Sequence, residues 1–364
     1  MKFLLVSGIY FPDIGGPATF IPKLAENLVR NGYQVTTLAL EDSKQIRSFE
    51  PWERFFIKRK LPRILRFPIV VGMLILKGKN CSVVFANGLH EESVIASKIL
   101  GKKVILKVVG NPIWERAKNR GLTTLDINTF NDSKIPKKLF LEKQLFRWAL
   151  ASADKVITPS KELETLMKQM SANCKTQVIP NGVKVNKVTT KQKKYDVIYF
   201  GRITKWKELA TLIDAVKKCN ASLVIVGDGP ERFALEKKAN AIGANVSFKG
   251  QLSQENLKEL IEQSRIFCLP SSYEGMSHSL LEAMSNEIPV IVSDIEPNLE
   301  LIENEFNGLT FTLRNPQNLS ERIKLLLGSA ELRKYLSENA KKDVIEKYEE
   351  SQILKKYLSI LVTE

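Results

Sequence analysis

Short apolar runs alternate with longer segments of helical periodicity along most of the chain. A run of about four to eight apolar residues bounded by glycine, proline or polar residues is typical of a buried strand. The runs that we predict as strands lie at residues 2–7, 33–40, 82–86, 104–109, 196–200, 222–226, 246–250, 266–269 and 288–292. Because strands that alternate with helices form parallel sheets covered by helices on both faces, the pattern predicts an α/β fold. Ligands of such sheets bind beyond the carboxyl ends of the strands, so these loops are the first candidates for a site.

The chain length favours two domains, because 364 residues are many for one α/β domain. A polar, lysine-rich stretch at residues 184–194 is predicted as the linker. We therefore expect a first domain at residues 1–183, a second at 184–345 and a C-terminal helix at 346–364. The apolar start is too short for a signal peptide and is predicted as the first strand. No run reaches the roughly 18 apolar residues of a membrane-spanning helix.

Charge is distributed unevenly between the two halves. Residues 1–185 contain 30 Lys and Arg against 15 Asp and Glu. Residues 186–364 contain 25 Lys and Arg against 25 Asp and Glu. The formal net charge of +15 therefore belongs to the first half. Such asymmetry indicates an anionic partner for that half alone.

Cysteine and histidine content argues against a metal centre and a disulfide framework. The four cysteines are scattered without C-x-x-C spacing, which is typical of a reducing compartment, and the chain has two histidines. We therefore expect no metal and no disulfide, and a cytoplasmic location.

Residues 52–79 interleave basic side chains with aromatic and aliphatic ones. A basic amphipathic segment of this kind fits one that lies at a membrane interface and is held by anionic lipid. The alternative is a surface helix whose apolar face packs on a sheet. Single-stranded nucleic acid also suits interleaved aromatic and basic residues, but no nucleic-acid-binding module is recognisable nearby, so we expect no nucleic-acid partner.

The segment 265–294 predicts a strand, a loop, a helix and a second strand, which is one βαβ crossover of a parallel sheet. Glu274 in the loop and Glu282 on the helix lie eight positions apart. The unpaired N–H groups of the helix start favour an anion, and each carboxylate can accept hydrogen bonds from vicinal hydroxyls. A ligand with a diphosphate in the middle and hydroxyl-rich groups at both ends suits this unit. The alternative is an acidic turn before a helix that carries an exposed glutamate.

Two cations and several glycines occupy other loops after predicted strands. Arg202 and Lys207 lie in a glycine turn ahead of a helix, where Arg can bind a diphosphate bidentately and Lys as a point charge. The alternative is a pair of solvated cations. Gly15 and Gly16 follow the first strand, and lacking a Cβ they permit close approach of a phosphate or form an ordinary tight turn. The loop at 227–230 is no dinucleotide fingerprint, because Arg232 replaces the third glycine.

These segments together resemble the E-x7-E pattern of the retaining glycosyltransferases of family 4 (group 1). The resemblance is carried by residues 270–275 (PSSYEG), 281–284 (LEAM), 289–290 (PV) and 201–207 (GRITKWK), and extends over nearly the whole chain. It implies the GT-B fold, with two Rossmann-like domains facing across a cleft and the last helix crossing back to the first domain. It also implies that the first domain binds the acceptor and the second the nucleotide-sugar donor.

The resemblance assigns roles to individual residues. It implies that Arg202, Lys207 and Glu274 are the catalytic residues, the two cations as diphosphate ligands and Glu274 as the partner of the sugar hydroxyls. Glu282 is expected to bind the ribose. The further donor-binding residues that it implies are Gly15, Gly16, Gly227, Gly250, Leu252, Gly275, Met276 and Ser277.

One departure from the family pattern lies after the strand at 104–109. Many members carry a histidine there, positioned against the donor sugar, whereas this chain has Val109, Gly110 and Asn111. Asn111, His90 and Glu115 are candidate substitutes on the acceptor or sugar side. His278, at the expected helix start, is a further candidate for the donor phosphate or sugar, although a structural role is the alternative.

The resemblance therefore implies a hexosyltransferase that uses UDP-hexose or GDP-mannose and retains the anomeric configuration. The expected acceptor is a lipid-linked or saccharide hydroxyl in cell-envelope glycan or glycolipid synthesis, reached at an anionic inner membrane surface. No cofactor is expected, and catalysis is expected to be independent of metal. The alternatives are a nucleotide-sugar epimerase of the same fold and a nucleotide-sugar binding protein without catalysis. The motifs do not choose the base, the sugar, the acceptor, the linkage position or the oligomeric state.

Overall fold

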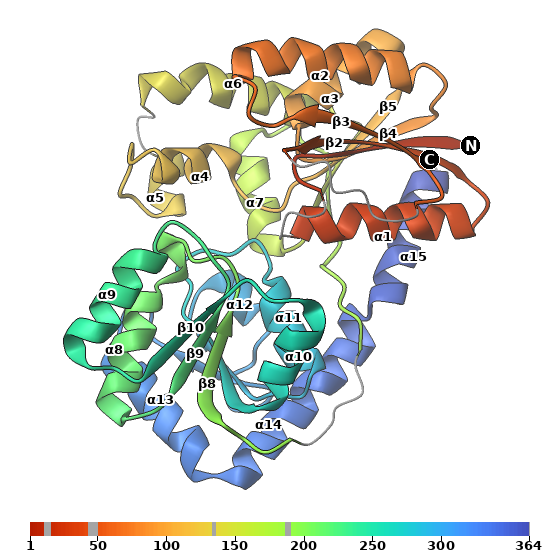
Figure 1. Cartoon of the computed structure of the whole chain (residues 1–364). Coiled ribbons are helices and arrows are strands. Elements are labelled where there is room, and N and C mark those ends of the chain that lie inside the picture. Colours follow the sequence, from red (N-terminus) through yellow and green to blue (C-terminus); the bar gives the residue numbers. More distant parts are fainter. Residues whose placement is uncertain (11–15, 43–49, 133–135, 186–190, 364) are drawn as a thin grey trace. The chain divides into compact units, whose positions relative to one another are not determined.

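The computed structural model describes residues 1–10, 16–42, 50–132, 136–185 and 191–363. The chain forms two compact units, and each is built on its own parallel sheet (Figure 1). The first unit contains Met1–Pro180 and Leu354–Glu364, and the second contains Asn181–Ile353. The predicted α/β fold class is confirmed.

The first unit has a seven-stranded sheet in the order β3-β2-β1-β4-β5-β6-β7, with all neighbouring strands parallel. Phe3 in the central strand pairs with Val35 on one side and Val83 on the other. Most residues of the inner strands are apolar and buried, as expected for a parallel sheet covered on both faces. The strands are β1 (Lys2–Ser7), β2 (Gln34–Glu41), β3 (Glu53–Lys58), β4 (Val83–Asn87), β5 (Lys103–Lys107), β6 (Lys155–Thr158) and β7 (Thr176–Val178).

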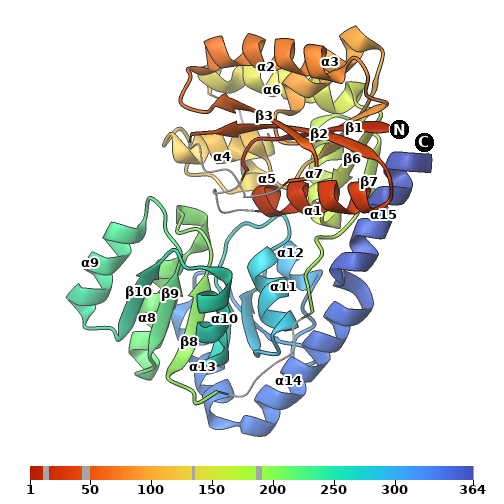
Figure 2. The same cartoon turned by 45° about the vertical axis from the view of Figure 1, so that its right-hand side comes forward.

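Helices cover both faces of this sheet. One layer contains α2, α3 and α6, and the opposite face carries α1 and α7 (Figures 1 and 2). The helices are α1 (Gly16–Arg30), α2 (Arg63–Gly78), α3 (His90–Leu100), α4 (Pro112–Asn119), α5 (Ile127–Asp132), α6 (Lys137–Ser152) and α7 (Lys161–Met170). Among the described residues, no helix is both long and apolar enough to span a bilayer.

The second unit has a six-stranded parallel sheet in the order β10-β9-β8-β11-β12-β13. Its helices α8, α9 and α13 lie on one face, and α10 and α11 on the other (Figure 1). The strands are β8 (Tyr195–Phe200), β9 (Leu223–Val226), β10 (Val246–Gly250), β11 (Ser264–Leu269), β12 (Val290–Ser293) and β13 (Leu309–Phe311). The helical elements are η1 (Lys205–Lys207), α8 (Leu209–Cys219), α9 (Arg232–Ile242), α10 (Gln254–Glu262), α11 (His278–Ser285), α12 (Glu296–Leu299), α13 (Pro316–Gly328), α14 (Ala330–Asp343), η2 (Val344–Tyr348) and α15 (Glu350–Thr363).

The predicted segment 52–79 is two elements. Residues Glu53–Lys58 form the edge strand β3, and the helix α2 begins only at Arg63. The short apolar run of β3 is compatible with a helix and with a strand. Its pairing with β2 makes it a strand. Val70 and Leu74 of α2 are buried, so part of its apolar face packs in the core, as the alternative interpretation required.

The unit boundaries differ from the predicted ones by several residues. The first unit ends at Pro180 because the next residues pair within the second. Val183 N–H donates to the carbonyl of Tyr348, and Glu350 N–H donates to the carbonyl of Val183, at 2.9 and 3.0 Å. The same pairing keeps residues 346–353 in the second unit, so the C-terminal segment of the first begins at Leu354 instead of 346. Residues 186–190 of the predicted linker lie outside the described residues.

Tyr357 anchors the C-terminal segment in the first unit. Its ring is fully buried and contacts the rings of Phe20 and Phe85, with centroids 4.8 and 5.9 Å away. The ammonium group of Lys107 lies 4.9 Å from the Tyr357 ring centroid and 3.7 Å from that of Phe20. Burial lowers the pKa of Lys107 to about 7. The segment is therefore held by aromatic packing, and by cation–π attraction when Lys107 carries its proton.

Tyr357→Phe is expected to leave stability unchanged or raise it. The Tyr357 hydroxyl is buried without a hydrogen-bond partner among the described residues, so its removal relieves a desolvation penalty. Tyr357→Ala, which deletes the ring, is expected to destabilise by about 3–5 kcal/mol. Thermal unfolding of both variants checks this, and a Phe variant less stable than the parent chain would show that the hydroxyl has a partner.

Candidate functional site

The loops at the carboxyl ends of β8, β9 and β10 are joined by backbone hydrogen bonds. Ile203 N–H donates to the carbonyl of Asp228 at 2.9 Å, and Gly227 N–H to that of Gly250 at 2.7 Å. Gly227 has φ +127°, and a Cβ there would lie 2.0 Å from the carbonyl oxygen of Gly201. Glycine is therefore required at 227 by the approach of the neighbouring loop. The predicted contact of Gly227 and Gly250 with the nucleotide stays a prediction.

Lys207 and Glu274, which were predicted in separate loops, form an ion pair. The ammonium nitrogen lies 2.5 Å from Glu274 Oε1, and the side chains are 14% and 9% exposed. Lys207 ends the short helix η1 after β8, and Glu274 precedes α11. Ser272 N–H donates to the carbonyl of Trp206 at 2.8 Å, so the backbone also joins these two loops. Each charge is thus compensated in a site with little access to water.

The start of α11 is fixed from two sides. Ser277 is the N-cap, and its Oγ accepts a hydrogen bond from Leu280 N–H at 3.2 Å. The side-chain amide of Asn181 donates to the carbonyl of Met276 at 3.1 Å. Gly275, Met276 and Ser277 are buried, so the backbone that leads into the helix is held rigidly. An oriented helix N-terminus of this kind is suited to an anion.

The other predicted donor residues are distributed around these loops. Arg202 is exposed and makes no ion pair with a described residue, while its carbonyl accepts a hydrogen bond from the buried Tyr199 hydroxyl at 2.9 Å. Leu252 is half-buried against the core of the second unit. His278 begins α11, and Glu282 lies half-buried further along it. Gly16 begins α1 of the first unit, whereas Gly15 lies outside the described residues.

A cavity of about 610 Å³ lies in the first unit, beyond the carboxyl ends of β1, β2, β4 and β5. His90 and Glu115, which were predicted on the acceptor or sugar side, both line it. Asn111 does not line it. The other lining residues include Gly8, Leu40, Asn87, Glu91, Glu92, Arg63, Arg66, Arg116 and Arg120.

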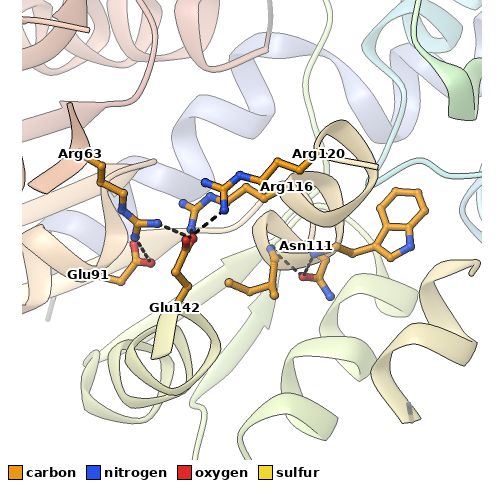
Figure 3. A network of polar contacts seen from close by, with 8 residues as sticks. Arg63, Glu91, Asn111, Arg116, Arg120 and Glu142 are labelled. Atoms are coloured by element: carbon orange, nitrogen blue, oxygen red, sulfur yellow. Dashed lines mark hydrogen bonds and ion pairs between the residues drawn. The ribbon is translucent and has the colours of Figure 1, made fainter. Parts of the chain in front are cut away.

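Asn111 has a structural role. Its side chain is fully buried, and Oδ1 accepts hydrogen bonds from the N–H groups of Ile113 and Trp114, each at 3.1 Å (Figure 3). It is therefore the N-cap of α4, with Pro112 in the first turn. Asn111 is thus a helix cap, and its predicted contact with a sugar stays a prediction.

His90 bridges two strand ends at the cavity. Its Nε2 lies 3.2 Å from Gly88 N and 3.0 Å from the carbonyl oxygen of Lys107. Burial lowers the pKa of His90 below its ordinary value, so the imidazole is neutral near pH 7. His90 therefore lies between the loop after β4 and the end of β5, where Nε2 either accepts a hydrogen bond from Gly88 N–H or donates one to the Lys107 carbonyl.

Three arginines that line the cavity surround one carboxylate, Glu142, in a cluster that the sequence patterns did not predict. Glu142 of α6 pairs with Arg63 of α2, with Arg116 at 2.7 Å and with Arg120 at 3.4 Å (Figure 3). Arg63 also lies 3.4 Å from Glu91. Burial alone would raise the pKa of Glu142, but Arg63 and Arg116 hold it below its ordinary value. The i,i+4 spacing of Arg116 and Arg120 was the available sequence signal.

Two family models match the chain. Residues 14–187 match the model described as Glycosyltransferase Family 4, and residues 183–343 match the model described as Glycosyl transferases group 1. Between them the models span residues 14–343, which include most of each unit.

Similar proteins carry glycosyltransferase names. The uncharacterized glycosyltransferase MJ1178 of Methanocaldococcus jannaschii is 23% identical over 94% of this chain and 92% of its own length. The uncharacterized glycosyltransferase MJ1607 of the same organism is 34% identical over 45% of this chain and 44% of its own. The N,N'-diacetylbacillosaminyl-diphospho-undecaprenol alpha-1,3-N-acetylgalactosaminyltransferase of Campylobacter jejuni is 33% identical over 43% and 40%. The last two matches thus span less than half of those relatives.

A solved structure shares the fold. Anabaena HepE, solved in complex with UDP and glucose, covers all of this chain and all of its own with a TM-score of 0.82 and 18% identity. The likeness shows that the chain has the same fold, which is the GT-B fold expected from the sequence.

Glu92→Gln is expected to change how stability depends on pH. Burial, followed by the charge of Glu91, raises the pKa of Glu92 from 4.5 to about 7. The folded chain therefore keeps a proton that the unfolded chain releases, and this group lowers stability as pH rises from 4.5 to 7. Glutamine does not titrate, so it removes that loss. The free energy of unfolding of the variant, minus that of the parent chain, should be about 1–3 kcal/mol larger at pH 8 than at pH 5.

Urea unfolding of the parent chain and the variant at both pH values measures this difference. Glu26→Gln, at an exposed position of the same unit, is the matched control and should show no such gain. If Glu92→Gln changes the free energy of unfolding equally at pH 5 and pH 8, the pKa of Glu92 is not raised.

Proposed function

We propose that this chain, which belongs to the group 1 glycosyltransferases of family 4, transfers a hexose from a nucleotide diphosphate sugar to an acceptor hydroxyl with retention of the anomeric configuration. The donor is UDP-hexose or GDP-mannose. The acceptor is a lipid-linked or saccharide hydroxyl, in cell-envelope glycan or glycolipid synthesis. The reaction needs neither a metal nor another cofactor.

The ion pair of Lys207 and Glu274 beside the start of α11 is the observation that carries this proposal. A cation, a carboxylate and a helix N-terminus lie at the ends of β8 and β11, where parallel sheets bind ligands. When the donor arrives, Lys207 exchanges its carboxylate partner for the diphosphate. Glu274 is then released to accept hydrogen bonds from the sugar hydroxyls.

Catalysis follows from stabilising the leaving diphosphate. The bond between the anomeric carbon and the phosphate oxygen breaks, and its electron pair leaves with the diphosphate while positive charge develops on the sugar. Lys207, the exposed Arg202 and the N–H groups at the start of α11 meet the charge that develops on the phosphate. The acceptor oxygen bonds to the anomeric carbon on the face that the phosphate leaves, and its proton passes to the leaving phosphate.

The first unit is proposed to act at an anionic membrane on the cytoplasmic side. The lipid-linked acceptor named for the Campylobacter relative supports this, as does the positive charge of the first half. The helices α2, α3 and α6 also expose large apolar side chains. They are Ile64, Leu65, Ile69 and Leu76 of α2, Ile99 of α3, and Phe140, Leu141 and Trp148 of α6. Apolar side chains among basic ones suit a membrane interface.

Lys207→Ala and Arg202→Ala are each expected to weaken nucleotide diphosphate binding by about tenfold or more, because each removes a charge-assisted contact. Glu282→Ala should also weaken it, since the ribose loses an acceptor. Calorimetric titration of UDP and of GDP with EDTA present measures this. Lys205→Ala, an exposed lysine of the same short helix, is the matched control and should bind like the parent chain.

If one nucleotide binds tightly and these substitutions leave its affinity unchanged, the nucleotide site does not lie in the second-unit loops. Product analysis then separates the activities. A transferase releases nucleotide only with an acceptor hydroxyl, whereas an epimerase converts the donor alone.

Leu65→Glu is expected to weaken binding to vesicles that contain anionic phosphatidylglycerol, because it places a carboxylate on the exposed apolar side of α2. Phe233→Glu, at an exposed position of α9 in the second unit, is the control and should bind as the parent chain does. Vesicle co-sedimentation at moderate salt measures both. Equal binding by the two variants, or no binding by the parent chain, would refute the membrane surface.

A further inference from the structure

Four arginines line the cavity of the first unit. Arg63 and Arg66 lie three positions apart on α2, Arg116 lies on α4, and Arg120 follows that helix. Residues three or four apart share a helix face, so each helix directs two guanidinium groups to the same cavity. Neither the family models nor the named relatives assign a function to these four.

The arginines have more hydrogen-bond donors than their protein partners use. Glu142 has two oxygens, and Arg63, Arg116 and Arg120 share them. Each guanidinium carries five N–H groups, so most of the donors are left for water or a ligand. The Nε of Arg66 is buried and has no hydrogen-bond partner among the described residues.

Like charges are crowded at this cavity. Burial lowers the pKa of Arg66; Glu92 offsets this in part, and Arg63, Arg59 and Arg116 lower the pKa further. The lining carboxylates are Glu91, Glu92 and Glu115, of which Glu92 still holds its proton below about pH 7. Crowding of cations in a partly buried place is unfavourable without a ligand and is relieved by an anion.

The same helix joins the cavity to an apolar surface. Arg63 and Arg66 of α2 line the cavity, whereas Ile64 and Leu65 between them are 87% and 57% exposed. On α6, Leu141 is exposed directly beside Glu142 in the sequence. Residues one or two positions apart point to different sides of a helix, so the guanidinium groups and these apolar side chains lie on different sides of α2. Because Arg63 and Arg66 are in the first turn of α2, a ligand whose anionic head occupies the cavity reaches the apolar side chains when its tail passes around the start of this helix.

We propose that Arg63, Arg66, Arg116 and Arg120 form the site for the phosphate or diphosphate group of an amphiphilic, lipid-linked acceptor, whose apolar chain lies along the exposed side chains of α2 and α6. This inference rests on the proposed function, since it takes the first unit as the acceptor unit. Glu142 keeps the guanidinium groups in place until the anion arrives. Arginine suits this role because its planar fork matches phosphate oxygens.

Calorimetric titration of the full chain with three probes tests the proposal. Farnesyl diphosphate carries both the anion and the apolar chain, inorganic diphosphate carries the anion alone, and farnesol carries the chain alone. Farnesyl diphosphate is expected to bind about tenfold or more tightly than either of the others. Equal binding of inorganic diphosphate would indicate a site for free phosphate, and equal binding of farnesol would indicate a purely apolar surface; either result overturns the proposal.

Substitutions locate the bound diphosphate. The double variant Arg116→Gln with Arg120→Gln should bind farnesyl diphosphate about tenfold or more weakly, because charge-assisted hydrogen bonds are lost. Arg30→Gln removes the same charge from the exposed end of α1 and should bind like the parent chain. A loss seen only in Lys207→Ala would place the diphosphate in the second-unit loops and would overturn the proposal.

Glu142→Gln separates an anion site from a purely structural cluster. It removes the internal competitor and leaves the arginines, so farnesyl diphosphate should bind several-fold more tightly, whereas a structural role predicts weaker binding. UDP and GDP titrations of the same samples report on folding and on the proposed function independently. Absence of nucleotide binding would count against the proposed function, while intact nucleotide binding with no effect of the arginines would count against this inference alone.

Discussion

Close backbone contact between neighbouring loops is the constraint on which the candidate donor site depends. A Cβ at Gly227 would lie 2.0 Å from the carbonyl oxygen of Gly201, and one at Gly229 would lie 2.2 Å from that of Ile203. Only glycine permits this approach, which joins the ends of β8 and β9 by backbone hydrogen bonds. The short helix that carries Lys207 follows directly, so the position of its ammonium group opposite Glu274 is inherited from these contacts.

Local patterns predicted what depends on neighbours in sequence. The nine predicted strands and the capped helix after Glu274 lie close to their expected residues, because apolar runs and caps act within a few positions. The cap at Asn111 followed by Pro112 is a local signal of the same kind, since Asn at the N-cap and Pro in the first turn are typical of a helix start. The Glu142 cluster was not predictable from the sequence. Arg63 and Glu142 are 79 positions apart, and only the packing of α2, α3 and α6 brings them together (Figure 1).

The two candidate sites use the same physical arrangement. In the second unit a carboxylate, Glu274, holds the cation that is proposed to meet the donor diphosphate. In the first unit another carboxylate, Glu142, holds the arginines that are proposed to meet the acceptor phosphate. A cation with reduced access to water is costly without a partner, so a carboxylate keeps each cation charged and oriented before a ligand binds.

This arrangement limits affinity and thereby serves turnover. An incoming phosphate has to displace a carboxylate that is already well placed, so only the difference between the two ion pairs appears as binding free energy. The displaced carboxylate then becomes available, which for Glu274 coincides with the arrival of the sugar hydroxyls it is proposed to hold. In the proposed mechanism Lys207 and Glu274 pair again when the diphosphate leaves, so the charge that assists bond cleavage does not retain the product.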